Sequence, residues 1–119
     1  MAQIKIRGYV TDSDGSSPTA FTLFRAGVDN DEITKTAADT LTIDSVVISG
    51  ASTGITTMFY SDDGTDDLDE RRLFSFHGSL VYTPPEPIQV PLGAFDIYLG
   101  NSGANAVVGT FTGTLFDVA

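Results

Sequence analysis

The stretch Leu92–Val118, LGAFDIYLGNSGANAVVGTFTGTLFDV, decides the fold class of this chain. Its β-branched and aromatic residues predict two strands, over residues 95–99 and 106–118. The loop between them, residues 100–105, is rich in Gly and Asn, which favour turns. We therefore expect the two strands to form a hairpin.

The second of these strands has two different faces. Phe111 and Leu115 alternate with glycines on one face, and we expect this face to pack closely against another sheet in the core. The opposite face carries a row of uncharged polar side chains, Thr110, Thr112 and Thr114. Because the cores of protein interfaces are depleted of charge, we expect this threonine row to lie near a partner subunit.

The N-terminal segment, residues 3–10, alternates with period two and predicts a half-buried strand. Lys5 and Arg7 share the outer face of this strand. In so acidic a protein the two cations could meet a row of carboxylates on a neighbouring subunit. The alternative is that they mark a solvated face or a guarded edge strand.

Five further segments predict strands between these two regions: residues 20–28, 41–49, 55–60, 72–83 and 88–92. The hydrophobic alternation slips within residues 41–49, which either a bulge near Asp44 and Ser45 or burial on both faces would explain. Residues 41–49 and 55–60 predict a second hairpin. Residues 33–39 are the one segment where we allow a short helix, with an extended crossing as the alternative.

This pattern predicts an all-β fold, namely a single antiparallel β-sandwich or jelly roll of seven to eight strands with at most one short helix. A length of 119 residues fits one domain over residues 1–119. The chain has no cysteine, so its stability depends on packing without disulfides or thiolate-bound metals.

The charge of the chain limits its partners. Sixteen acidic and six basic residues give a net charge of −10, which argues against nucleic acid and anionic membranes, because both require a basic surface. The charged N-terminus does not predict a signal peptide, and no apolar run of about 18 residues predicts a membrane span. Residues 73–119 hold only three charged side chains. This favours an interface in that half, with a Thr/Ser-rich β core as the alternative.

The most acidic segment, residues 61–70, invites a calcium hypothesis, because hard cations bind carboxylate oxygens. Its candidate ligands are Asp62, Asp63, Asp66, Asp67 and Asp69. The spacing does not fit an EF-hand loop. We therefore interpret the segment as a solubilising loop, with a calcium site between sandwich loops as the alternative.

His77 is the only histidine, and so the only side chain that could act as a base near neutral pH without a shifted pKa. On a strand, Ser75 and Ser79 would lie about 7 Å from it, too far to form a nucleophile and base pair. We therefore predict a surface or interface histidine, a chain that is not an enzyme, and no cofactor or small-molecule substrate.

Carbohydrate binding without catalysis is a further alternative for a β-sandwich. Its candidate stacking platforms are Tyr9, Tyr60, Tyr82 and Tyr98. All four residues also have ordinary packing roles, and the chain has no tryptophan.

The chain resembles the small β-sandwich or jelly-roll proteins that decorate or cement the heads of tailed bacteriophages. The likeness spans residues 38–118. Its segments are ADTLTI (38–43), VVI (46–48), RLF (72–74), GSL (78–80) and GTFTGTL (109–115).

The resemblance implies a non-enzymatic virion protein on the outer capsid surface, made in the host cytoplasm. It also implies a homotrimer that clamps neighbouring subunits of the coat protein and stabilises the lattice. Residues 1–37 lie outside the likeness and would be an arm or strand that reaches a neighbour. The alternative function is a carbohydrate- or calcium-binding β-sandwich module.

Overall fold

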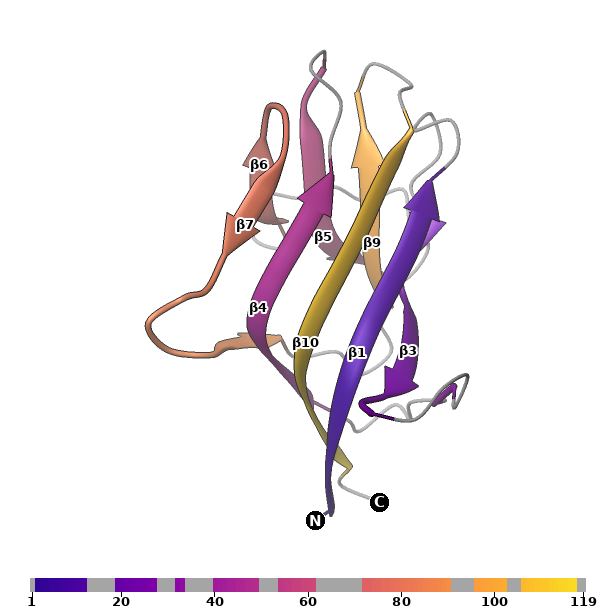
Figure 1. Cartoon of the computed structure of the whole chain (residues 1–119), viewed down its shortest axis with the longest axis vertical. Helices are drawn as coiled ribbons and strands as arrows, with labels where there is room; N and C mark the ends of the chain where they lie inside the picture. The colour runs from indigo at the N-terminus through magenta and orange to yellow at the C-terminus, as the bar shows by residue number, and fades with distance from the viewer. Residues whose placement is uncertain are drawn as a thin grey trace.

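The computed structural model describes residues 2–12, 19–27, 32–33, 40–49, 54–61, 72–90, 96–102 and 106–117. Within these residues it contains ten strands and no helix. The strands form two antiparallel sheets, which face each other (Figure 1). The predicted all-β sandwich is confirmed.

Sheet A runs through β3 (Thr22–Arg25), β1 (Ala2–Asp12), β10 (Val107–Asp117) and β4 (Thr40–Ser49). Two short strands share the edge beyond β4, namely β7 (Leu80–Tyr82) and β8 (Ile88–Val90). Sheet B runs through β2 (Thr19–Ala20), β9 (Asp96–Asn101), β5 (Thr56–Ser61) and β6 (Arg72–Phe76).

The strand pairing is nested. β1 pairs with β10, β2 with β9, β4 with β7 and β5 with β6, as in one long antiparallel ribbon folded over on itself. Two further pairs, β10 with β4 and β9 with β5, join the ribbon within each sheet. This connectivity is that of an eight-stranded jelly roll, to which β3 and β8 are short additions.

Both hairpins predicted from the sequence are wrong. β9 and β10 lie in opposite sheets, and so do β4 and β5. Each strand has one apolar face, and placing consecutive strands on opposite sides of the core buries both faces. The alternating pattern is the same in a hairpin and across a sandwich, so it identifies the strands without identifying their partners.

Two segments predicted as single strands are each divided between the sheets. Residues 72–83 form β6 and β7, and the turn between them contains Gly78 at φ +70°, which glycine adopts without strain. Residues 20–28 were also predicted as one strand. The chain instead changes sheet at Phe21, between β2 and β3, and Phe21 is buried.

The predicted bulge in β4 is confirmed. The register between β4 and β10 shifts by one residue, which leaves Asp44 without an opposite residue. Leu41 and Ile43 before the bulge are buried, and so are Val46 and Ile48 after it, whereas Val47 between the last two is exposed. Because of the extra residue, the alternate side chains on both sides of the bulge point into the core. On the other side of β4, β8 pairs before the bulge and β7 after it.

Two other segments complete the comparison with the sequence. The predicted short edge strand at residues 88–92 is confirmed as β8. The sequence allows a short helix at residues 33–39; Ile33 is not helical, and residues 34–39 lie outside the described residues. Just before them, Glu32 forms an isolated β-bridge with Phe24 of β3.

The core lies between the two sheets and includes the predicted inward face of β10. Phe111 and Leu115 are each 1% exposed. The ring of Phe111 contacts that of Phe21 edge-on, with centroids 5.1 Å apart. A Cβ added at Gly109 would lie 3.0 Å from Leu99 of sheet B. Gly109 therefore permits the close packing between the sheets that the sequence predicts, whereas a Cβ at Gly113 would meet the backbone of Thr42 in the neighbouring strand β4.

Candidate assembly surface

The side of sheet A that points away from sheet B is here called the outer face. Its position follows from the pleat, because residues between the buried positions of each strand point outward. The outer-face residues that carry the argument are Lys5, Arg7 and Tyr9 of β1, Ser45 and Val47 of β4, Val81 of β7, and Val108, Thr110, Thr112 and Thr114 of β10.

The five interface candidates from the sequence lie together on the outer face. Lys5 pairs with Thr114, and Arg7 pairs with Thr112, across β1 and β10. Thr110 pairs with Tyr9 in the same register. Strand pairing thus joins two groups of residues from opposite ends of the chain into one surface.

Three exposed hydrophobic side chains, with the half-buried Thr110 between two of them, form a row across the outer face, perpendicular to the strands. Val81 is paired with Val47, Val47 with Thr110, and Thr110 with Tyr9. The exposed fractions are 77% for Val81, 46% for Val47 and 46% for Tyr9. We call Val81, Val47, Thr110 and Tyr9 together the apolar row. Val108, also exposed, lies two residues from Thr110 on β10.

Sequence reasoning missed Val47 and Val81 as surface candidates. Each occurs singly within a strand-like segment, and an isolated exposed valine is common on protein surfaces. Only the order of strands in sheet A places them beside Thr110 and Tyr9. The signal that identifies these two valines as surface candidates is therefore the strand pairing, which a single sequence does not reveal.

The hydroxyl groups at the centre of the outer face, those of Ser45, Thr110 and Thr112, already have hydrogen-bond partners within the sheet. Thr110 Oγ1 donates to the carbonyl oxygen of Gly8 at 2.9 Å. The hydroxyls of Ser45 and Thr112 are hydrogen-bonded to each other at 2.7 Å. Burying a polar group that is already paired costs less than burying one that loses its water. The centre of the face can therefore be covered at a small desolvation cost.

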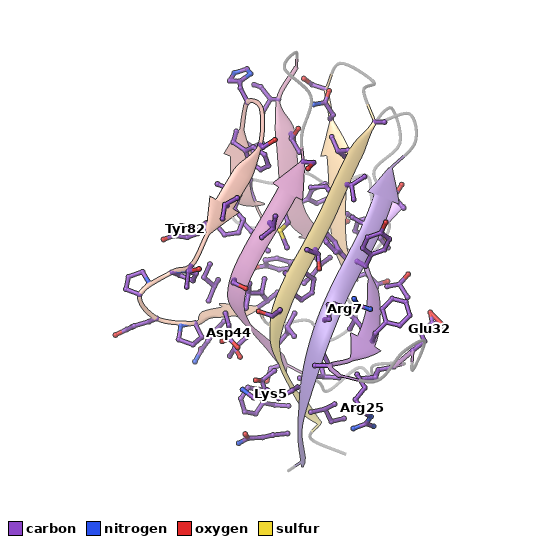
Figure 2. The ribbon with its side chains drawn as sticks, in the orientation of Figure 1. Lys5, Arg7, Arg25, Glu32, Asp44 and Tyr82 are labelled. Atoms are coloured by element: carbon purple, nitrogen blue, oxygen red, sulfur yellow. The ribbon has the colours of Figure 1, made fainter. Side chains whose placement is uncertain are left out.

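The two cations of the outer face turn in opposite directions (Figure 2). Lys5 leans over β10, where its Nζ donates to Thr114 Oγ1 at 3.0 Å. Arg7 turns toward β3, and its Cζ lies 5.7 Å from the ring centroid of Phe24, within the range of a cation–π contact. Thr114 is only 5% exposed, so it supports Lys5 and offers little surface of its own. Thr112, by contrast, is exposed.

The outer face is less acidic than the chain as a whole. Lys5 and Arg7 are two of only six basic residues in a chain of net charge −10. Among the described side chains of the sheet A strands, Asp44 at the bulge is the one acid. No family model, curated protein or solved structure matches this chain. Functional inference therefore depends on the chemistry of this surface.

His77 lies in the turn between β6 and β7, not in a strand as expected. The expectation of a surface position is confirmed, since His77 is exposed. Its Nδ1 donates to the carbonyl oxygen of Gly54 at 2.8 Å. The hydroxyl of Ser75 is hydrogen-bonded to that of Thr57 at 3.2 Å. The bond to Gly54 gives His77 a structural role, because it links the turn to the segment before β5.

The five calcium candidates, Asp62, Asp63, Asp66, Asp67 and Asp69, lie outside the described residues. Within the described part of the chain, no cluster of three or more His, Cys, Asp or Glu side chains could hold a metal ion. In the same part of the chain, no helix has the length and apolar character needed to cross a membrane.

The four tyrosines considered as sugar platforms are divided between the sheets. Tyr9 and Tyr82 are exposed strand residues of sheet A, and Tyr60 and Tyr98 are half-buried in sheet B. Tyr98 stacks on Phe59 with centroids 5.8 Å apart, and Tyr82 contacts Phe74 edge-on at 5.7 Å. The four rings therefore do not form one shared platform.

Proposed function

We propose that this chain is a non-enzymatic structural protein that assembles with copies of itself through the outer face of sheet A. The observation that carries the proposal is the apolar row, beside hydroxyls that are already hydrogen-bonded within the sheet. Exposed apolar patches of this kind mark sites of protein association. The low charge of the face agrees with the composition of interface cores.

In its finer form, the proposal is that the assembled protein decorates the outer capsid surface of a tailed bacteriophage and binds the coat protein. The resemblance of residues 38–118 to head decoration proteins supports this form. The jelly-roll connectivity is also an architecture of viral capsid domains. Both supports are analogies of sequence and fold. Capsid and portal genes beside the source gene, together with this chain in purified particles, are the expected observations.

A pair of matched substitutions tests the assembly surface. Val47 and Ile55 are almost equally exposed, at 46% and 45%, but Ile55 lies away from the outer face, where its backbone is hydrogen-bonded to Ser102. Val47→Asp places a carboxylate in the apolar row, whereas Ile55→Asp places the same charge elsewhere. We expect the wild type and Ile55→Asp to sediment as oligomers at micromolar concentration, and Val47→Asp to sediment as a folded monomer.

Thr112→Lys is a second variant with the same purpose. It adds a cation beside Arg7 on an exposed position of the outer face, so we expect weaker assembly with an unchanged circular dichroism spectrum. A wild-type protein that stays monomeric at high micromolar concentration would contradict the proposal. Oligomers that persist in both Val47→Asp and Thr112→Lys would place the interface on another surface.

The alternative function, a carbohydrate- or calcium-binding module, is addressed by separate measurements. Lectin domains also use jelly rolls. A glycan array and a thermal-shift titration with calcium chloride test the two kinds of ligand. A saturable response in either one, combined with a monomeric protein, would favour the binding module over the structural protein.

A further inference from the structure

We infer that the outer face pairs with the outer face of a second copy, about a two-fold axis that runs along the apolar row and across the strands. This inference rests on the proposed function, which already takes the outer face as the assembly surface. It adds the identity of the partner surface and the symmetry of the contact. In such an isologous contact, the same patch of each copy meets itself.

The size of the outer face fits this arrangement. Sheet A is five strands wide along the apolar row, from β3 to β7. β1, β4 and β10 are ten or eleven residues long, while β3, β7 and β8 have four, three and three. With strands about 4.8 Å apart and a rise of about 3.3 Å per residue, these strands cover roughly 670 Å². A stable interface buries about 600–1,000 Å² on each partner, so the face has the size that a dimer requires. Two such faces can stack about 10 Å apart, as the two layers of a β-sandwich do.

The position of the cations selects the direction of the axis. Lys5 and Arg7 both lie on the same side of the apolar row, before Tyr9 on β1. An axis parallel to the strands would place the cations of both copies in the same half of the interface, where like charges repel. An axis along the row places them in opposite halves. Each pair of cations then faces the half of the other copy that carries Val108 and Ser49.

This symmetry makes specific predictions about which residues meet. Residues of the apolar row lie on the axis, so Val47 of one copy meets Val47 of the other. Thr112 and Val108 lie two residues to either side of Thr110 on β10. The axis exchanges these two positions, so Thr112 of one copy meets Val108 of the other. An axis along β10 would instead bring Thr112 to Thr112.

Disulfide cross-linking tests these pairs directly, because the chain has no cysteine of its own. The variants are Val47→Cys, Thr112→Cys and Val108→Cys, each oxidised gently and run on a non-reducing gel. We expect Val47→Cys to cross-link to itself and an equal mixture of Thr112→Cys and Val108→Cys to form a mixed dimer. Thr112→Cys alone should give several-fold less dimer. Ile55→Cys is the control, because Ile55 is about as exposed as Val47 and its cross-linking shows how much dimer forms by random collision.

The outcomes separate this inference from the proposed function. Efficient self-cross-linking of Thr112→Cys would overturn the inferred axis. A trimeric mass, as the phage resemblance implies, would overturn the isologous contact, because that contact produces dimers. Suppose that Val47→Asp is monomeric where the wild type is oligomeric, but Val47→Cys gives no more disulfide-linked dimer than Ile55→Cys. The inferred axis then fails, while the assembly surface stands. If oligomers persist in both Val47→Asp and Thr112→Lys, the proposed assembly surface fails as well.

Discussion

At the scale of single residues, the absence of a side chain at Gly8 is what allows Phe111 to lie in the core. The two residues are directly opposite each other on β1 and β10. A Cβ added at Gly8 would overlap the ring of Phe111. The ring thus occupies the space above the glycine, where it also contacts the ring of Phe21 edge-on.

We therefore predict that Gly8→Ala destabilises the fold by about 1–3 kcal/mol, because Phe111 must leave its position in a tightly packed core. Urea denaturation measures the change in the free energy of unfolding. Phe111→Leu provides the control, since it removes the ring that the new methyl group meets. In the double variant, Gly8→Ala should cost less than it does in the wild type. Equal costs in both backgrounds would show that the ring is not the cause.

At the scale of strands, the bulge at Asp44 fixes which side of β4 faces the core. Side chains alternate with period two, so one residue more or less exchanges the two faces of a strand. With the bulge, Leu41 and Ile43 are buried together with Val46 and Ile48. The fold therefore depends more on the presence of an extra residue at position 44 than on the carboxylate of Asp44.

This argument predicts different results for removing the residue and for removing its charge. Deleting Asp44 should abolish cooperative thermal unfolding, because Leu41 and Ile43 would turn outward while Thr42 turned into the core. Asp44→Ala keeps the residue count, and we expect it to change the free energy of unfolding by less than about 1 kcal/mol. Circular dichroism melting curves distinguish the two. A deletion variant that melts like the wild type would contradict the assigned bulge.

The same element shows what a single sequence can reveal. Period-two alternation is a local property, so residues 41–49 indicate both the strand and its bulge. Sheet membership depends on contacts between distant segments, so the alternation could not show that β4 and β5 lie in opposite sheets. The same distinction between local pattern and long-range contact applies to the outer face. The threonine row of β10 is visible within one strand, whereas Val47 and Val81 become neighbours only through strand pairing.

At the scale of the whole molecule, self-association must overcome repulsion between copies. Each copy carries a net charge of −10, while Asp44 is the one acid among the described side chains of the sheet A strands. In the inferred dimer, contact is therefore made mainly by uncharged side chains, and most of the acids act at long range. Long-range repulsion is screened by salt, with a Debye length of about 10 Å at 0.1 M and about 3 Å at 1 M.

We predict that raising sodium chloride from about 0.1 M to about 1 M strengthens self-association, because screening removes repulsion between the copies. Sedimentation equilibrium gives the dissociation constant at each sodium chloride concentration.

The control variant combines Glu86→Gln and Asp96→Asn, two exposed acids outside the outer face. This variant has a net charge of −8, from −10 plus two. It should associate more tightly at low salt and respond less to added salt. Weaker association at high salt would instead mean that Lys5 and Arg7 bind an acidic partner surface, since such ion pairs are screened in the same way.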